Sequence, residues 1–264
     1  MNVSDLVFGL MASQSKQEYS FEDLRWLTAP FQVTEATLRT NLSRMTANGV
    51  IQTSHQGRMA FYSFGDKGQR IRSNVAHGFV ALDWSGWDGT YWGVIFSVPD
   101  THGEERHYIR KKLTKYRFAL LNPGFWIRPC HPSESIPQTL HTLLSSGYCR
   151  LIRFSNHSEF TAEQMIRMWN LRAVNRQFIK VLALIEESEK KLPFLSADQA
   201  LAERMNVGNT AIQTIFNDPM LPPQFLPQNW QGDHIRKQYR RFDSLAAACS
   251  KPYWEKIYQK EDTK

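Results

Sequence analysis

The stretch TEATLRTNLSRMTANGVI, residues 34–51, constrains the fold of this chain more than any other segment. Thr34 is a favourable N-cap, and the Asn-Gly pair near the end of the stretch is a helix stop. Leu38, Leu42 and Met45 recur at i, i+4 and i+7, so they share one face of the helix between those two signals. The opposite arc carries small and hydrogen-bonding side chains, namely Ala36, Arg39, Thr40, Ser43 and Arg44. The pattern predicts a short helix that packs one face on its own domain and leaves the polar face for solvent or a partner.

Two more helices precede this stretch, and a hairpin follows it. Apolar residues at helical spacing predict a helix over residues 3–12, and Ser20 begins a capping-box-like sequence whose helix ends before Pro30. Two β-type runs, residues 50–54 and 59–64, are separated by a Gln-Gly-Arg turn. Helix, helix, helix and hairpin is the element order of a winged helix-turn-helix.

The polar face of the third helix has the chemistry of a DNA-reading surface. Arginine bridges the major-groove acceptors of guanine, and serine and threonine bond bases or phosphates. A basic hairpin tip suits the DNA backbone or the minor groove. The candidate DNA-binding residues are Thr37, Arg39, Thr40, Ser43 and Arg44 on the helix and His55 and Arg58 on the hairpin. A solvated helix face and a charged turn would look similar, so the motif is a hypothesis to be weighed with its context.

The charge of the whole chain favours a phosphate-bearing partner, but the winged helix-turn-helix alone is only weakly basic. The whole chain has a formal net charge of +7, which suits nucleic acid. Residues 1–72 contain eight Lys and Arg against six Asp and Glu, a net charge of only +2. One such module would bind double-stranded DNA modestly, because phosphate contacts supply much of the affinity. We therefore expect a homodimer, which doubles the contacts.

The middle of the chain predicts a unit that can dimerise. We interpret the polar, basic residues 66–73 as a linker. After them the predicted order is β-α-β-β-α-β, which is the ferredoxin-like arrangement. The strands are expected at residues 91–98, 118–121, 125–128 and 148–154, and the helices at residues 104–116 and 133–144. The edges and open face of such a sheet often pair with a second copy.

The remainder of the chain predicts helices. They are expected over residues 160–187, from Ser196, over residues 209–216 and over residues 233–247, while the proline-rich residues 218–230 must lie extended. The fold class is therefore α+β, in three domains. These are a winged helix-turn-helix over residues 1–72, a ferredoxin-like dimerisation domain over residues 73–155, and a helical domain over residues 156–264.

Several classes of protein fit the sequence poorly. No apolar run approaches the roughly 20 residues that span a bilayer, and no secretion signal is evident, so we expect a cytoplasmic protein with no membrane partner. Three widely spaced cysteines fit neither a disulfide framework nor a zinc ribbon. We find no nucleophile triad, phosphate loop or dinucleotide motif, and expect neither an enzyme nor a cofactor.

Three groups of motifs resemble the PaaX-type repressors, which control phenylacetic acid catabolism in bacteria. The first is LRTNLSRMTANGVI with GRMAFYSFGDKGQR, the second is WDGTYWGVIFSVP with RHYIRKKLTKYRFALLNPGFWIRP, and the third is LPPQFLPQNWQGDHIRKQYRRF. The resemblance runs in order over nearly the whole chain. It implies a homodimeric transcriptional repressor whose winged helix binds a palindromic operator and which an aryl-acetyl coenzyme A thioester releases. It also places Arg39, Thr40, Ser43 and Arg44 on the recognition helix and Arg58 on the wing.

An acyl-coenzyme A effector would need basic groups for its phosphates and an apolar slot for its acyl part. The candidate effector-binding residues are Arg106, Arg110, Lys111, Trp126, Arg128 and Trp230. A solvated basic strip and core tryptophans are the competing interpretation of the same residues.

Two alternatives use the ferredoxin-like unit differently. A metal-dependent nuclease would need clustered carboxylates, but Asp100 is the only candidate near the end of the first strand. His102, His107 and His131 lack the spacing of a metal site. An RNA-binding module would need exposed aromatic residues in a basic, glycine-containing run, and Phe125 lies on a strand without one.

Overall fold

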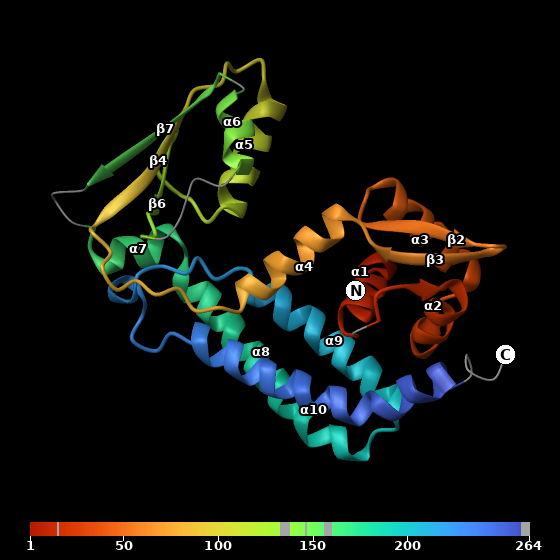
Figure 1. Cartoon of the computed structure of the whole chain (residues 1–264). Coiled ribbons are helices and arrows are strands. Elements are labelled where there is room, and N and C mark those ends of the chain that lie inside the picture. Colours follow the sequence, from red (N-terminus) through yellow and green to blue (C-terminus); the bar gives the residue numbers. More distant parts are fainter. Residues whose placement is uncertain (15, 133–137, 146, 156–159, 260–264) are drawn as a thin grey trace. The chain divides into compact units, whose positions relative to one another are not determined.

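The computed structural model describes the chain except residues 15, 133–137, 146, 156–159 and 260–264 (Figure 1). The chain forms two compact units. Unit 1 comprises Met1–Val80, Gln177–Asn217 and Gln231–Lys264, and unit 2 comprises Ala81–Arg176 and Asp218–Trp230. Each unit is therefore built from segments that are distant in the sequence.

Unit 1 begins with the predicted winged helix-turn-helix, which is confirmed. Its helices are α1 (Val3–Ala12), α2 (Phe21–Thr28) and α3 (Glu35–Ala47), and its antiparallel sheet has the order β1-β3-β2, with β1 (Tyr19–Ser20), β2 (Ile51–Gln56) and β3 (Met59–Phe64). Ser20 caps α2 through a capping box with Asp23, and the Thr34 side chain accepts from the backbone N–H of Thr37 at the start of α3. These local signals fix the starts of the two helices that form the turn.

The apolar core of the winged helix includes two helices from the other end of the chain. Leu38, Leu42 and Met45 of α3 are almost fully buried, as their spacing predicts. The same cluster contains Leu201 and Trp254, which belong to α9 (Ala197–Ile215) and α10 (Gly232–Gln259). The C-terminal helices thus complete the core of the N-terminal module.

A polar contact joins the same elements. The Tyr253 hydroxyl donates to the Trp26 carbonyl at 2.7 Å. Burial, and secondarily the negative charge of Asp198, raises the pKa of Tyr253 to about 12. The phenol therefore keeps its proton, and this hydrogen bond, throughout the neutral pH range.

The prediction of a linker at residues 66–73 is wrong, because these residues form helix α4 (Asp66–Gly78). The helix is mostly exposed, which explains its polar composition. It contacts the hairpin through Gly68, where a Cβ atom would lie 2.1 Å from the Val50 carbonyl oxygen. Since only glycine allows this approach, Gly68 is a packing residue of α4.

Three helix boundaries in the C-terminal part also differ from the predictions. Residues 160–187 form two helices, α7 (Ala162–Met168) and α8 (Leu171–Lys191), because Asn170 takes a left-handed conformation with φ 49°. The helices expected from Ser196 and over residues 209–216 are one helix, α9, which ends at Ile215, and α10 extends past Pro252. The residues that α9 and α10 bury against each other and against the winged helix stabilise these longer helices.

Unit 2 contains the predicted ferredoxin-like arrangement, which is confirmed. Its elements are β4 (Thr90–Phe96), α5 (Gly103–Lys115), β5 (Ala119–Asn122), β6 (Phe125–Pro129), α6 (Gln138–Ser145) and β7 (Cys149–Ser155). The four strands are antiparallel in the order β5-β6-β4-β7. Residues 133–137 of the predicted second helix lie outside the described residues.

Both faces of this sheet are at least partly covered. α5 and α6 lie on one face (Figure 1), where Ile109, Leu113 and Trp126 are buried. On the other face Met165 of α7 packs with Tyr91 and Ile127. The proline-rich segment adds Phe225 there, and apart from the single 3-10 turn Pro223–Phe225 it has no helix, as predicted.

Candidate DNA-binding surface and a pocket in unit 2

The polar residues of α3 lie on one exposed face of the winged helix. Thr37, Arg39, Thr40, Ser43 and Arg44 are all exposed, while the apolar stripe of the same helix is buried. The expected separation of the two faces is therefore present. Hydroxyl and guanidinium groups therefore lie on the exposed face, together with the small side chain of Ala36.

Arg39 is oriented by an aromatic ring. Its guanidinium carbon lies 3.8 Å from the centroid of Phe21, and Nη2 lies 3.9 Å from Oε2 of Glu35. The side chain is still 63% exposed. Stacking on Phe21 covers one face of the guanidinium and leaves its N–H edge available for planar, bidentate bonding.

Arg44 is oriented by a buried amide. Its Nη2 donates to Oδ1 of Asn41 at 2.5 Å and to the hydroxyl of Ser4 at 3.1 Å. Asn41 is 8% exposed, and its Nδ2 donates to the Thr37 carbonyl at 2.8 Å. Both the oxygen and the nitrogen of the Asn41 side-chain amide are therefore hydrogen-bonded, which fixes the direction of the Arg44 side chain. The sequence contained one sign of this role, a polar residue within the apolar stripe.

The hairpin presents the two remaining candidates. His55 and Arg58 are exposed at the β2–β3 turn, where Gly57 has φ 61°. The hydroxyls of Thr46 and Thr53 lie 3.3 Å apart and join the end of α3 to β2. A hydrogen bond between side chains thus connects the exposed polar residues of α3 with those of the wing.

The structure does not bring the six candidate effector-binding residues together. Arg106 bonds the Asp100 carboxylate at 2.6 Å and the Val98 carbonyl at 2.9 Å, while Trp126 is buried in the core between the sheet and its helices. Arg110 and Lys111 are exposed on α5, and Trp230 is half-buried in the proline-rich segment. Of the six, only Arg128 lines the small pocket of unit 2.

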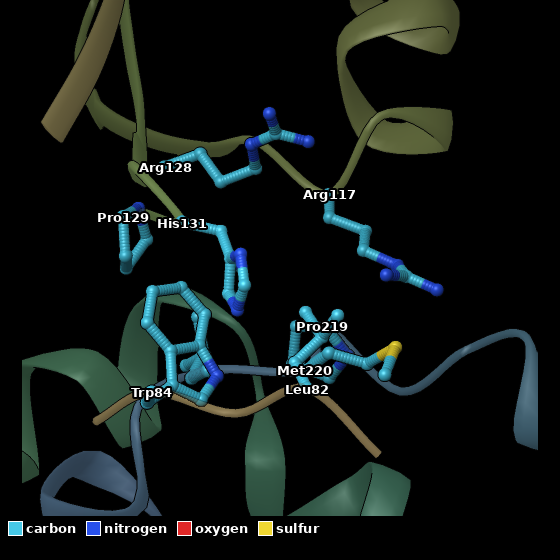
Figure 2. A pocket seen from close by; sticks show the side chains of 9 residues that line it. Leu82, Trp84, Arg117, Arg128, Pro129, His131, Pro219 and Met220 are labelled. Carbon is cyan, nitrogen blue, oxygen red and sulfur yellow. The ribbon is translucent and has the colours of Figure 1, made fainter. Parts of the chain in front are cut away.

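That pocket lies within unit 2 and has a volume of about 220 Å³ (Figure 2). Its lining residues are Leu82, Trp84, Arg117, Arg128, Pro129, His131, Pro219, Met220 and Leu221. Figure 2 shows Arg128, Pro129 and His131 on one side and Trp84 with Pro219 and Met220 facing them. Basic and apolar groups therefore share one small cavity.

Hydrogen bonds hold the basic side of the pocket in place. Arg128 is 8% exposed, donates from Nη1 to the Tyr116 carbonyl at 3.1 Å, and has its guanidinium carbon 5.1 Å from the centroid of Phe118. His131 donates from Nε2 to the Asp83 carbonyl at 2.7 Å, and its ring meets that of Trp84 edge-on at 4.9 Å. Sequence reasoning missed Trp84 and Arg117, because no motif marks residues that converge only in the fold.

The residues of the metal and nuclease alternatives are dispersed. Asp100 is almost fully exposed and bonds Arg106. His102 bonds the neighbouring Thr101, while His131 belongs to the pocket. In the described part of the chain no group of three or more His, Cys, Asp or Glu side chains is placed to hold a metal ion. Nor does any described helix have the length and apolar character to cross a membrane.

Comparison with known proteins supports one family over the length of the chain. The model for PaaX-like protein matches residues 5–68, that for the PaaX protein central Cas2-like domain residues 85–166, and that for the PaaX-like protein C-terminal domain residues 169–256. A curated relative is the transcriptional repressor PaaX of Escherichia coli (strain K12), which is 23% identical over 217 residues. That match covers 77% of this chain and 66% of the relative, just under two thirds of its length.

A solved structure has the same fold. The uncharacterized protein Rv0674 from Mycobacterium tuberculosis aligns with a TM-score of 0.63 at 20% sequence identity, over 95% of this chain and 96% of that one. The fold therefore agrees with the three family matches, which follow one another in order along the sequence. The chain belongs to the family of PaaX-like proteins.

Proposed function

We propose that this protein is a transcriptional repressor that binds double-stranded DNA with α3 and the β2–β3 wing. The observation that carries the proposal is the exposed polar face of α3 with its two oriented arginines, Arg39 stacked on Phe21 and Arg44 held by Asn41. The relative from Escherichia coli is a transcriptional repressor by name, which supports the same function here. The groups that read DNA are Thr37, Arg39, Thr40, Ser43 and Arg44, with His55 and Arg58 from the wing.

The repressor acts in the cytoplasm as a homodimer on a palindromic operator in a bacterial catabolic operon. The modest charge of residues 1–72 supports this, since two copies double the number of phosphate contacts. An acyl-coenzyme A thioester, such as an aryl-acetyl thioester, releases the protein from DNA. The protein is not an enzyme and needs no cofactor. The exposed, paired Asp100 gives no support to a nuclease.

A mobility-shift assay on DNA upstream of the gene tests the proposal. Arg44→Ala is expected to weaken binding by about 1–3 kcal/mol, because a bidentate base contact contributes that much. Arg110→Ala, an exposed arginine of α5, is the matched control and keeps the affinity of the wild type. Absence of any shifted complex with upstream DNA, together with binding to RNA of random sequence, would contradict the proposal.

Asn41→Ala is expected to reduce operator affinity by about 0.5–1.5 kcal/mol, the net contribution of a typical hydrogen bond, because Arg44 loses its oriented partner. Ser4→Ala removes the longer contact of Arg44 and the bond that the Ser4 hydroxyl donates to Oδ1 of Asn41, but it keeps the bond between Arg44 and Asn41, so it is expected to have the smaller effect. Affinity is measured by titrated mobility shift, and thermal unfolding confirms that each variant is folded. If Asn41→Ala binds like the wild type while Arg44→Ala does not, Asn41 has no positioning role.

A further inference from the structure

One acidic side chain lies on the helix that carries the candidate DNA-binding residues. Glu35 is the first residue of α3, directly after the N-cap Thr34, and it is the only acid in residues 34–47. Its side chain is 55% exposed. A carboxylate in the first turn favours the helix dipole, but on a surface that meets phosphates it also weakens the attraction to DNA.

Two arginines lie close to this carboxylate. Oε1 of Glu35 is 3.7 Å from Nε of Arg25, and Oε2 is 3.9 Å from Nη2 of Arg39. Both distances are longer than the roughly 2.7–3.2 Å of an N–H···O hydrogen bond. The nearby positive charges therefore reduce the repulsion between Glu35 and phosphates, while both oxygens keep lone pairs for another donor.

Each arginine is held more closely by a different residue. Arg25 donates from Nε to Oε2 of Glu22 at 2.8 Å and from Nη2 to the other oxygen of the same carboxylate. Arg39 stacks on Phe21, with its guanidinium carbon 3.8 Å from the ring centroid. Glu35 is therefore a weak partner of two arginines that other residues orient, so its carboxylate remains available to a ligand of the surface.

The position of Glu35 suits contact with a base edge. In helix-turn-helix proteins the N-terminal residues of the recognition helix contact the bases in the major groove. Glu35 precedes Arg39 by four residues, which is about 6 Å along a helix axis, and base pairs are stacked about 3.4 Å apart. The 3.9 Å between the charged ends of the two side chains matches about one such step. The two groups therefore reach neighbouring base pairs.

The chemistry of a carboxylate selects among the four bases. It only accepts hydrogen bonds, and cytosine presents its N4 amine in the major groove as a donor. Guanine presents two acceptors and thymine an acceptor and a methyl group, so their oxygens face the carboxylate unfavourably. Adenine offers an amine, but its N7 acceptor lies beside that amine. A carboxylate therefore prefers cytosine, whereas an arginine prefers guanine.

We propose that Glu35 determines operator specificity, because its carboxylate accepts a hydrogen bond from the N4 amine of a cytosine in the base pair next to the one that Arg39 contacts. Guanine and thymine are excluded at that position by their acceptor oxygens. The inference rests on the proposed function, since it requires that α3 reads DNA. It adds a residue that contributes discrimination between bases rather than affinity for phosphates.

Selection of binding sites from a library of random-sequence duplex DNA, with the full-length wild type and Glu35→Gln, tests the inference. Glutamine keeps the size of the side chain, but its amide both donates and accepts and can bond adenine at N6 and N7. At one position in each half-site the preference for cytosine over adenine is expected to fall about fivefold or more, the lower end of the effect of one mismatched base pair. The guanine beside it is expected to remain preferred.

Glu18→Gln is the matched control, because Glu18 is an exposed acid that precedes β1 and undergoes the same chemical change. Both variants remove one negative charge from residues 1–72, so both are expected to bind DNA of unrelated sequence somewhat more tightly. Only Glu35→Gln is expected to alter the selected bases. Thermal unfolding verifies that each variant is folded.

An unchanged base preference in Glu35→Gln overturns the inference. So does a loss of preference only at the position where Arg39→Ala also loses it, because Glu35 would then act by holding Arg39 and not by contacting a base. A wild type that selects no sequence from the library contradicts the proposed function, and the inference falls with it. A wild type that does select a sequence keeps the proposed function, whatever the Glu35 variant selects, so the two failures are distinguishable.

Discussion

Trp254→Ala is expected to lower the free energy of unfolding of unit 1 by about 3–5 kcal/mol, the usual cost of removing a buried large aromatic side chain. Trp254 is 4% exposed and lies in the same apolar cluster as Leu10, Leu38 and Leu42. Its loss opens a cavity in the core of the winged helix, although the residue lies more than two hundred positions further along the chain. Urea unfolding followed by circular dichroism measures the change.

Lys251→Ala is the matched control, because Lys251 lies on the exposed side of the same helix. It is expected to change stability by less than about 0.5 kcal/mol. A Trp254→Ala effect as small as that of the control would mean that the winged helix folds without α10. The larger effect means that DNA binding and the C-terminal helices share one folding unit.

Asp243→Ala is expected to destabilise unit 1 by about 3 kcal/mol, because it leaves a buried guanidinium without its counter-charge. Arg204 of α9 donates to both carboxylate oxygens of Asp243 on α10, at 2.8 and 3.1 Å. The arginine side chain is only 7% exposed, and the aspartate side chain is 35% exposed. We place the cost at the lower end of the range for buried pairs, since water reaches the carboxylate.

The double variant Arg204→Met/Asp243→Leu is the informative comparison. Replacing both charges with apolar groups removes the unpaired ion, so it is expected to recover most of the stability that Asp243→Ala loses. Chemical denaturation of the wild type and both variants gives the two differences. A double variant that is no more stable than Asp243→Ala would show that the packing of α9 on α10 requires the ion pair itself.

The elements that the sequence predicted correctly have strong local signals. Ser20 and Thr34 cap their helices, and the spacing of Leu38, Leu42 and Met45 fixes which face of α3 is buried. The order β-α-β-β-α-β follows from short alternating runs and turn residues, and the sheet order then follows from topology. Each of these signals lies within a window of about one element.

The wrong predictions share a different physical cause. The polar, basic composition of residues 66–73 indicates a linker, but in the fold these residues form a helix whose Gly68 allows a close approach to the Val50 backbone. The last helix is expected to end at residue 247, yet it continues past Pro252 to Gln259, where the burial of Trp254 stabilises it. In both cases a contact made by a distant segment outweighs the local preference.

The same distinction between local signals and contacts made by distant segments applies to the candidate sites. The exposure of Arg39 and Arg44 followed from helical periodicity, because it depends on one helix alone. The roles of Phe21 and Asn41 did not follow, because they depend on how α3 meets α2 and α1. The pocket was beyond reach from the sequence, since its lining residues come from positions 82 to 221 and carry no common motif.

If α3 reads bases, operator variants show it most directly. Affinities of the wild type, Arg39→Ala and Arg44→Ala are measured for an operator and for each of its single-base-pair substitutions. We expect each arginine variant to lose about 1–3 kcal/mol on the native operator and to lose discrimination at one base pair in each half-site. Native-like affinity and undiminished discrimination at every position in both variants would contradict the claim.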